Sequence, residues 1–222
     1  MKILIAVPCM DQVPVPFCYS LAMLDKPEGC SLTMKSGSMI YSSRDSLAAT
    51  AVQGEYDYIF WMDSDMQFPQ DALTRLLATL QEKKLDIITG LYYRRTPPYS
   101  PVLFDELEIL ENGESAYSEF DEIPDALFKV GGCGFGCVLM DTGVFLDVHG
   151  KFGELFTPIG RNGEDTSFCW RARQCGYEIW CDPSVECGHV GYSTITRAFS
   201  ESFRENLKKK VGGADNGTLG RC

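Results

Sequence analysis

The chain has 222 residues, 45% of them hydrophobic, with 20 basic and 31 acidic side chains and a net charge of −11. This composition predicts a globular protein whose core needs no cross-links. The acidic balance disfavours an extended basic surface for duplex nucleic acid or anionic membranes, although a local basic groove is compatible with it. The first apolar run ends at Pro8 and is too short for a signal peptide or a membrane span, so we expect a cytoplasmic protein without stable membrane insertion.

Strands and helices alternate over the first 90 residues. Short apolar runs predict strands at 3–7, 31–35, 58–62 and 86–89. Helices are expected at 15–24, at 45–52 with a hydroxyl cap from Ser42 or Ser43 and a stop at Gly54, and at 69–83 with Pro69 in the first turn. This alternation predicts an α/β fold with a mainly parallel, doubly wound sheet and helices on both faces.

The pattern changes after Gly90. A turn-rich link at 92–99 leads to a meander of short strands at 102–120 around Asn112-Gly113, which predicts a small antiparallel insertion over about 92–125. Four glycines between 131 and 136 then precede a strand. They are compatible with backbone amides that approach an anion or a sugar and equally with a close crossing of strands, and they lack the Lys-Ser/Thr ending of a phosphate loop.

The last third is predicted to contain three helices and two short strands. The helices are expected at 142–148, from 165 to a C-cap at Gly176, and at 198–211, and the strands at 178–181 and 184–187.

Ten cysteines are many for this length, and four of them lie six residues apart between 169 and 187. Without an export signal, reduced cysteines packed as small hydrophobic side chains are favoured over disulfides. The pairs Cys133/Cys137 and Cys181/Cys187 are not the tight pairs of zinc fingers or ribbons, so a structural zinc site is the minor alternative.

Three polar features follow a predicted strand or open a predicted helix. Strand 58–62 ends in Asp63-Ser64-Asp65, at the sheet edge where open α/β folds bind ligands and where carboxylates can hold a divalent cation. Glu164-Asp165 opens a helix, and His189 follows a strand. Each alone has an ordinary explanation, because acidic residues favour helix N-termini and most single histidines are structural. Together they predict one site assembled from distant segments.

At this point the chain resembles the GT-A nucleotide-sugar glycosyltransferases, in particular the family 2-like enzymes, over about residues 3–190. The resemblance rests on Val7-Pro8, Arg44-Asp45-x-Leu47-Ala48, Ile59 to Asp65 with Phe68-Pro69, Gly131 to Met140, Gly163-Glu164-Asp165-x-x-Phe168-x-x-Arg171 with Gly176-Tyr177, and His189. It implies a Rossmann-like GT-A fold with one catalytic domain over 1–211. Residues 1–90 would form the nucleotide-binding half and 91–211 the acceptor half, followed by a flexible tail at 212–222.

The resemblance also implies roles for individual residues. Asp65 would bind Mn²⁺ or Mg²⁺, Asp63 would contact ribose or the metal, and His189 would complete the metal site. Asp165 resembles the catalytic base of inverting members, with Glu164 orienting the acceptor. The nucleotide, expected to be that of a UDP-sugar, would be held by Pro8, Asp11, Arg44, Asp63 and Ser64. One departure is that residues 35–38 lack the acidic residue that often contacts uracil in the family.

These roles predict metal-dependent transfer of a sugar to an acceptor hydroxyl. The metal would stabilise negative charge on the leaving diphosphate, and Asp165 would remove the proton of the attacking hydroxyl, which favours inversion. Three alternatives stay open. They are a retaining GT-A enzyme, a sugar nucleotidyltransferase, which the lack of glycine and lysine in Pro8–Asp11 disfavours, and a non-catalytic sugar-binding protein with stacking tryptophans.

The acceptor is open among a saccharide, a lipid-linked sugar, a protein side chain and a modified DNA base. Arg94, Arg95 and the lysines at 208–210 could form a local basic patch for DNA, and only the helix around 199–210 offers a weak candidate for a membrane anchor.

Overall fold

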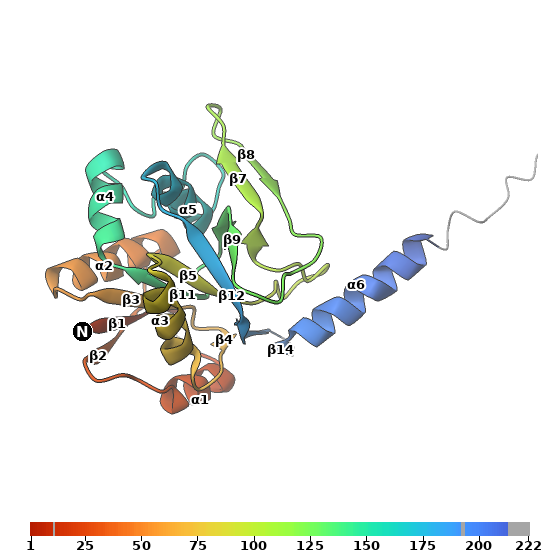
Figure 1. Ribbon diagram of the computed structural model, residues 1–222, viewed down its shortest axis with the longest axis horizontal. Coiled ribbons are helices and arrows are strands. Elements are labelled where there is room, and N and C mark those ends of the chain that lie inside the picture. The colour runs from red at the N-terminus through yellow and green to blue at the C-terminus, as the bar shows by residue number, and fades with distance from the viewer. Residues whose placement is uncertain (11, 192–193, 213–222) are drawn as a thin grey trace, which may run out of the picture.

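The computed structural model describes residues 1–10, 12–191 and 194–212. Its centre is a seven-stranded sheet in the order β2-β1-β3-β11-β5-β12-β9 (Figure 1). The strands are β1 (Ile3–Pro8), β2 (Cys30–Lys35), β3 (Tyr58–Met62), β5 (Ile87–Leu91), β9 (Phe128–Val130), β11 (Cys137–Asp141) and β12 (Ile179–Glu186). Strands β11 and β9 run against the other five. The expected mixed, mainly parallel sheet is confirmed.

Helices cover both faces of this sheet because alternate residues of each strand point to opposite sides. Leu4 and Trp61 belong to the core cluster beneath α2, α4 and α5, whereas Ile5 and Phe60 belong to the cluster beneath α1 and α3. The helices are α1 (Val15–Met23), α2 (Ile40–Gln53), α3 (Ala72–Lys83), α4 (Gly143–Phe152) and α5 (Glu164–Gln174). The two clusters hold the strand ends rigidly at the edge where the polar motifs lie.

The antiparallel insertion contains a hairpin, β7 (Glu106–Ile109) with β8 (Ser115–Ser118), which projects from the body (Figure 1). Its turn includes Gly113 at φ 80°, a backbone conformation that favours glycine. A second pair joins β6 (Leu103–Phe104) to β10 (Gly132–Cys133). The meander expected around Asn112-Gly113 is therefore present.

A small three-stranded sheet at the same edge has the order β14-β13-β4. Its strands are β4 (Met66–Gln67), β13 (Gly188–Val190) and β14 (Thr194–Ile195). Strand β13 pairs with β4, so that His189 lies opposite Met66, one residue beyond Asp65. This pairing was not predicted, and it joins the two ends of the site.

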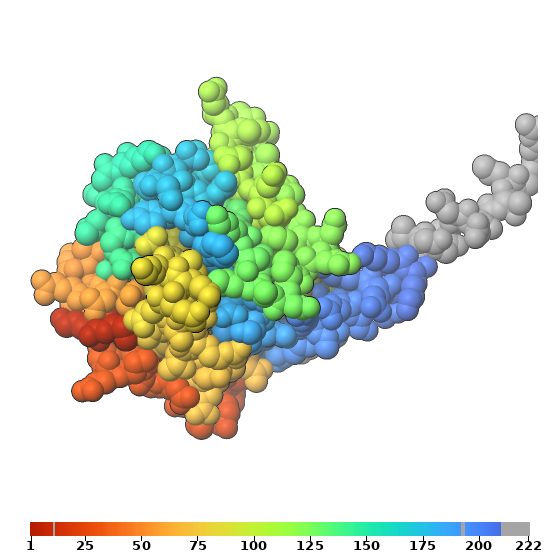
Figure 2. Space-filling view, viewed as in Figure 1, coloured from red at the N-terminus to blue at the C-terminus, as the bar shows by residue number. Residues whose placement is uncertain are grey.

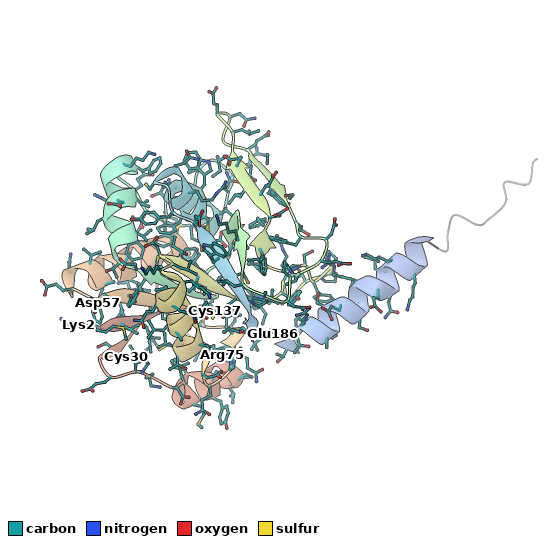
Figure 3. The ribbon with its side chains drawn as sticks, in the orientation of Figure 1. Lys2, Cys30, Asp57, Arg75, Cys137 and Glu186 are labelled. Atoms are coloured by element: carbon teal, nitrogen blue, oxygen red, sulfur yellow. The ribbon has the colours of Figure 1, made fainter. Side chains whose placement is uncertain are left out.

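Helix α6 (Arg197–Gly212) runs outward from the body (Figures 1 and 2). Its start is held by Glu186, which accepts a hydrogen bond from the Arg197 backbone N–H at 2.9 Å (Figure 3). Within the described ranges, no helix has both the length and the apolar character needed to cross a membrane. The tail predicted to be flexible lies almost wholly outside the described residues.

Two helix starts differ from the predictions. Helix α2 begins at Ile40, five residues early, and Ser43 is buried inside it and hydrogen-bonds Ser38 Oγ at 2.7 Å instead of capping the helix. Helix α3 begins at Ala72. Pro69 precedes the helix in a turn, where the Pro69 carbonyl oxygen accepts a hydrogen bond from the Ala72 N–H at 3.1 Å. In both places the hydrogen bonds that form differ from those that the capping signal in the sequence implied.

The two strands expected between 178 and 187 form one strand, β12. Pro183 lies where the β12–β5 register shifts, between Asp182 and Glu186. Proline has no N–H to donate to a sheet ladder, and an irregularity of this kind accommodates it. Five of the nine cysteines among the described residues are buried, where their side chains pack as small hydrophobic groups.

Candidate active site

A pocket of about 230 Å³ opens where β1 and β3 end. The two strands are parallel neighbours, so Pro8 and the segment Asp63-Ser64-Asp65 emerge side by side. Glu164 and Asp165, at the first turn of α5, line the same pocket. Carboxylates about a hundred residues apart in sequence therefore meet in one cavity.

Arg44 links the two acidic segments from beneath. Its guanidinium donates to Asp63 Oδ1 at 2.7 Å and to Glu164 Oε1 at 3.2 Å, and its side chain is only 2% exposed. The cation also lies over the rings of Trp61 and Phe135, at 5.5 and 5.2 Å from their centroids. Arg44 therefore fixes Asp63 and Glu164 in place.

Asp63 and Glu164 each form an ion pair with Arg44, whereas no ion pair within 4 Å joins Asp165 to a cation among the described residues. One of its oxygens accepts the Thr166 N–H at 2.7 Å at the start of α5. Burial, followed by the adjacent charge of Glu164, raises the pKa of Asp165 to about 6. A carboxyl group with this pKa can accept a proton near neutral pH, which suits a general base.

Asp65 lies on the other side of the pocket with different partners. Its Oδ2 is 2.7 Å from Arg95 Nη1 and 3.4 Å from His189 Nε2. Burial acts to raise the pKa of Asp65, but His189 and Arg95 outweigh that effect and lower it, so the carboxylate stays ionised. The two aspartates of the motif are thus not equivalent, because Asp63 is bound to Arg44 and Asp65 faces His189.

The orientation of His189 is set by the loop after β5. His189 Nδ1 lies 2.8 Å from the Tyr93 carbonyl oxygen, which can only accept, so Nδ1 carries the proton. In the neutral imidazole, Nε2 then presents its lone pair toward Asp65. The ring of Tyr92 packs edge-on against His189 with centroids 5.7 Å apart and limits its rotation.

The glycines after Val130 serve packing. Added Cβ atoms would lie 2.8 Å from the Asp105 carbonyl oxygen at Gly131 and 2.8 Å from Tyr92 Cζ at Gly136, and at Gly134 they would overlap the Tyr92 hydroxyl. Of the two interpretations open from the sequence, the structure therefore supports close strand and ring contacts. This packing places Tyr92 against His189.

We expect Gly134→Ala to lower the free energy of unfolding by about 1–3 kcal/mol, because the new methyl group displaces buried Tyr92. Urea denaturation measures the change. Gly150→Ala in α4 is the matched control, since nothing lies within 4 Å of the added Cβ, and it should leave stability unchanged or slightly higher. Equal stability of the two variants would contradict the packing role of Gly134.

Two solved structures share this architecture. "Crystal Structure of A197 from STIV" superposes with a TM-score of 0.65 at 18% identity, covering 86% of each chain. "Crystal structure of GalNAc-T7 with UDP, GalNAc and Mn2+" gives a TM-score of 0.60 at 9% identity and covers 86% of this chain but 44% of the other. No curated protein matches the chain.

A family model described as "Glycosyl transferase family 2" matches residues 46–147, just under half of the chain. The chain is therefore similar to family 2 glycosyltransferases and has a GT-A-like fold. The matched stretch carries Asp63-Ser64-Asp65 and ends before Glu164-Asp165 and His189, so the assignment of the later residues depends on the geometry described above.

The glycosyltransferase fold brings most of the predicted site residues together. Pro8, Arg44 and Ser64 line the pocket with the carboxylates. His189 is not part of the lining but contacts Asp65. Asp11, predicted to hold the nucleotide, lies outside the described residues.

Two contributions to the site were not predicted. The Tyr93 carbonyl and the Arg95 side chain come from the segment interpreted as a turn-rich link, and Arg95 was assigned only to a possible basic patch. The one signal in the sequence was an arginine close after the fourth predicted strand, at the sheet edge that carries Asp65.

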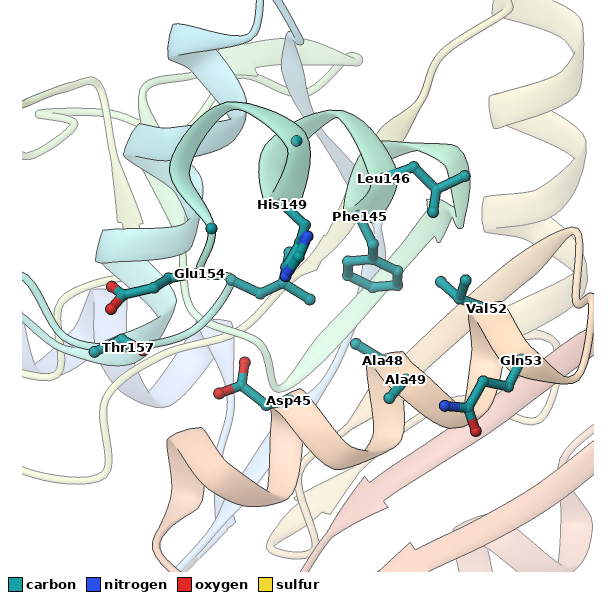
Figure 4. A pocket seen from close by; sticks show the side chains of 13 residues that line it. Asp45, Ala48, Ala49, Val52, Gln53, Phe145, Leu146, His149, Glu154 and Thr157 are labelled. Carbon is teal, nitrogen blue, oxygen red and sulfur yellow. The ribbon is translucent and has the colours of Figure 1, made fainter.

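A larger pocket of about 580 Å³ lies between α2 and α4 (Figure 4). It is lined mainly by apolar side chains such as Val52 and Phe145, and Asp45 and His149 also belong to the lining. One oxygen of Asp45 already accepts the Phe156 N–H at 3.1 Å. The pocket contains none of the residues predicted for catalysis, so size alone does not mark the candidate site.

Proposed function

We propose that the protein is a metal-dependent glycosyltransferase that transfers a sugar from a UDP-sugar to an acceptor hydroxyl with inversion at the anomeric carbon. The observation that carries this proposal is the meeting of Asp65 and His189 on one side of the pocket with Asp165 on the other. The uninterrupted sheet supports one catalytic domain over 1–211, with the nucleotide held by its first 90 residues.

The donor atoms at Asp65 fit a divalent cation. Carboxylate oxygen and neutral imidazole nitrogen both suit Mn²⁺, and Mg²⁺ also binds carboxylates, with substrate phosphates completing the coordination. The described residues contain no group of three acidic, histidine or cysteine side chains arranged to hold a metal, so the donor's diphosphate would complete the coordination of Asp65 and His189. When bound, the ion stabilises negative charge on the leaving diphosphate.

The backbone contact of His189 supports the same assignment. Histidine ligands of metals commonly donate their other ring N–H to a carbonyl or carboxylate, which fixes the tautomer. Here the Tyr93 carbonyl accepts from Nδ1 and leaves Nε2 free to bind. Asp63, held by Arg44, is better placed to meet ribose or to act through water than to share the position of Asp65.

Asp165 is the proposed general base. It removes the proton of the acceptor hydroxyl as the oxygen attacks the anomeric carbon, while Glu164, fixed by Arg44, orients the acceptor. Attack from the side opposite the leaving diphosphate inverts the configuration. NMR of the product anomer tests this step, and a retained configuration would refute it.

UDP is the proposed nucleotide, supported by the family resemblance and by the UDP in the GalNAc-T7 structure. We expect UDP with Mn²⁺ to raise the melting temperature more than GDP or CMP does. At a hundredfold excess over Kd, bound ligand stabilises by ~2.7 kcal/mol. Differential scanning fluorimetry with and without Mn²⁺ makes the comparison.

Asp65→Asn is expected to remove the Mn²⁺-dependent part of this stabilisation. Asp71→Asn is the control, because Asp71 is an exposed carboxylate that pairs only with Arg75 among the described ion pairs. If the melting temperature of the unmodified protein rose equally with and without Mn²⁺, the proposed metal site would be contradicted. A larger rise with GDP than with UDP would contradict uracil as the nucleobase of the donor.

A further inference from the structure

Arg95 occupies the position next to Asp65 where a cation is needed. Its Nη1 lies 2.7 Å from Asp65 Oδ2 and 3.5 Å from the Val190 carbonyl oxygen. Val190 in turn donates its backbone N–H to the Asp65 carbonyl oxygen at 2.7 Å. The guanidinium is therefore held at the junction of the loop after β5, the end of β3 and strand β13.

The same carboxylate oxygen also faces the ring of His189. His189 Nε2 lies 3.4 Å from Asp65 Oδ2, and Nδ1 uses the ring proton of the neutral imidazole for the Tyr93 carbonyl. The position of Arg95 Nη1, 2.7 Å from the same oxygen, places a positive charge beside this contact.

A divalent ion that binds Asp65 Oδ2 would compete with Arg95 for that oxygen. A metal would lie roughly 2.0–2.6 Å from the carboxylate oxygen. Arg95 Nη1 is 2.7 Å from the same oxygen, so the two positive charges would lie within about 5 Å of each other. Their mutual repulsion favours the departure of one cation from Asp65.

We propose that Arg95 is an internal counter-cation, which holds Asp65 in the donor-free enzyme, is displaced by the divalent ion, and then binds the diphosphate of the nucleotide-sugar. This inference rests on the proposed function, since it names how that same site is charged before the donor binds. The Arg95 side chain is 51% exposed, so it can move without disturbing the core. A displaced guanidinium remains beside the ion, where the donor's diphosphate oxygens must lie.

The neighbouring arginine provides a matched control. Arg94 lies 3.9 Å from Glu119 and is 43% exposed, similar to Arg95, but it does not contact Asp65. Arg94→Gln and Arg95→Gln remove the same charge one residue apart. Only Arg95→Gln removes the cation from Asp65.

The test measures two affinities of the full chain. Mn²⁺ alone is titrated and followed by the electron paramagnetic resonance of the free ion, and UDP is titrated by calorimetry in saturating Mn²⁺. We expect Arg95→Gln to bind Mn²⁺ about fivefold more tightly, because an exposed competing ion pair is lost. We expect it to bind UDP at least about fivefold more weakly, because a charged hydrogen bond to phosphate is lost.

Opposite changes in the two affinities distinguish this role from a structural defect, which would weaken both. Unchanged or weaker Mn²⁺ binding in Arg95→Gln overturns the counter-cation, as does an equal change in Arg94→Gln. Unchanged UDP affinity in Arg95→Gln overturns the proposal that Arg95 binds the diphosphate after the ion displaces it. Asp65→Asn separates the two levels of the argument, since normal Mn²⁺ binding in that variant would refute the proposed metal site itself, whatever Arg95 does.

Discussion

Asp165→Asn is expected to reduce sugar transfer by about 10²- to 10⁴-fold, the usual contribution of a general base, while binding of the nucleotide-sugar stays intact. The amide keeps the size of the carboxyl group and the contact with the Thr166 N–H but cannot accept a proton. Single-turnover transfer and calorimetric titration of the donor measure the two properties separately. A variant that transfers sugar at the normal rate would refute the assignment.

The pH dependence of the unmodified enzyme gives a second readout of Asp165. Because burial and Glu164 raise its pKa to about 6, the base is protonated and inactive below that value. The rate of transfer should therefore rise with pH through about 6 and then level off. Asp165→Asn should lose this rise, whereas a variant that merely misplaced the acceptor would keep it.

Stability provides the control for folding. The folded pKa of Asp165 lies above the value of 3.8 expected for an exposed carboxyl, so the unfolded chain ionises first as pH rises. Asp165 thus costs folding free energy increasingly between about pH 4 and 6, and the full cost remains above that range. At pH 7.5, Asp165→Asn should melt at the same temperature as the unmodified protein or higher. If Asp165→Asn lost both stability and transfer, the lost transfer would be explained by a folding defect and would not support Asp165 as the general base.

The strands of the nucleotide half could be predicted because their signal is local. Tyr58 to Met62 is an apolar run that ends abruptly in carboxylates, and such a run is buried wherever the sheet places it. The edge at which the polar residues gather follows from the direction of parallel strands. Both features depend on neighbours in the sequence and on general rules of sheet topology.

The charge distribution within the site could not be predicted in this way. Arg95 contacts Asp65 across 30 positions, and Tyr93 fixes His189 across 96, through loops without hydrophobic periodicity. Strand β4 has two residues and β13 has three, too few for an alternating pattern to appear. The glycines near residue 134 were ambiguous because their meaning depends on Tyr92, a partner some 40 positions away. Tertiary pairing, not local propensity, decides each of these features.

Arg44→Met should produce the largest loss of stability among the substitutions at this site. We expect the free energy of unfolding to fall by about 3–5 kcal/mol. Methionine fills much of the space between Trp61 and Phe135, so the cost comes mainly from charge. Asp63 and Glu164 would remain close together without the guanidinium that now binds both. Their partial exposure to water places the expected cost nearer the lower figure.

Two further variants make this expectation specific. Arg44→Lys keeps the charge but cannot reach both carboxylates with a planar fork, so it should fall between the unmodified protein and Arg44→Met. Lys83→Met removes a cation from an exposed pair with Glu82 and should change stability by no more than about 0.5 kcal/mol. Urea denaturation at neutral pH ranks the three. If Arg44→Met were as stable as Lys83→Met, the buried arginine could not be what holds the strand-end aspartate and the helix-start glutamate in one site, and their proximity would have to come from the packing of β3 against α5 alone.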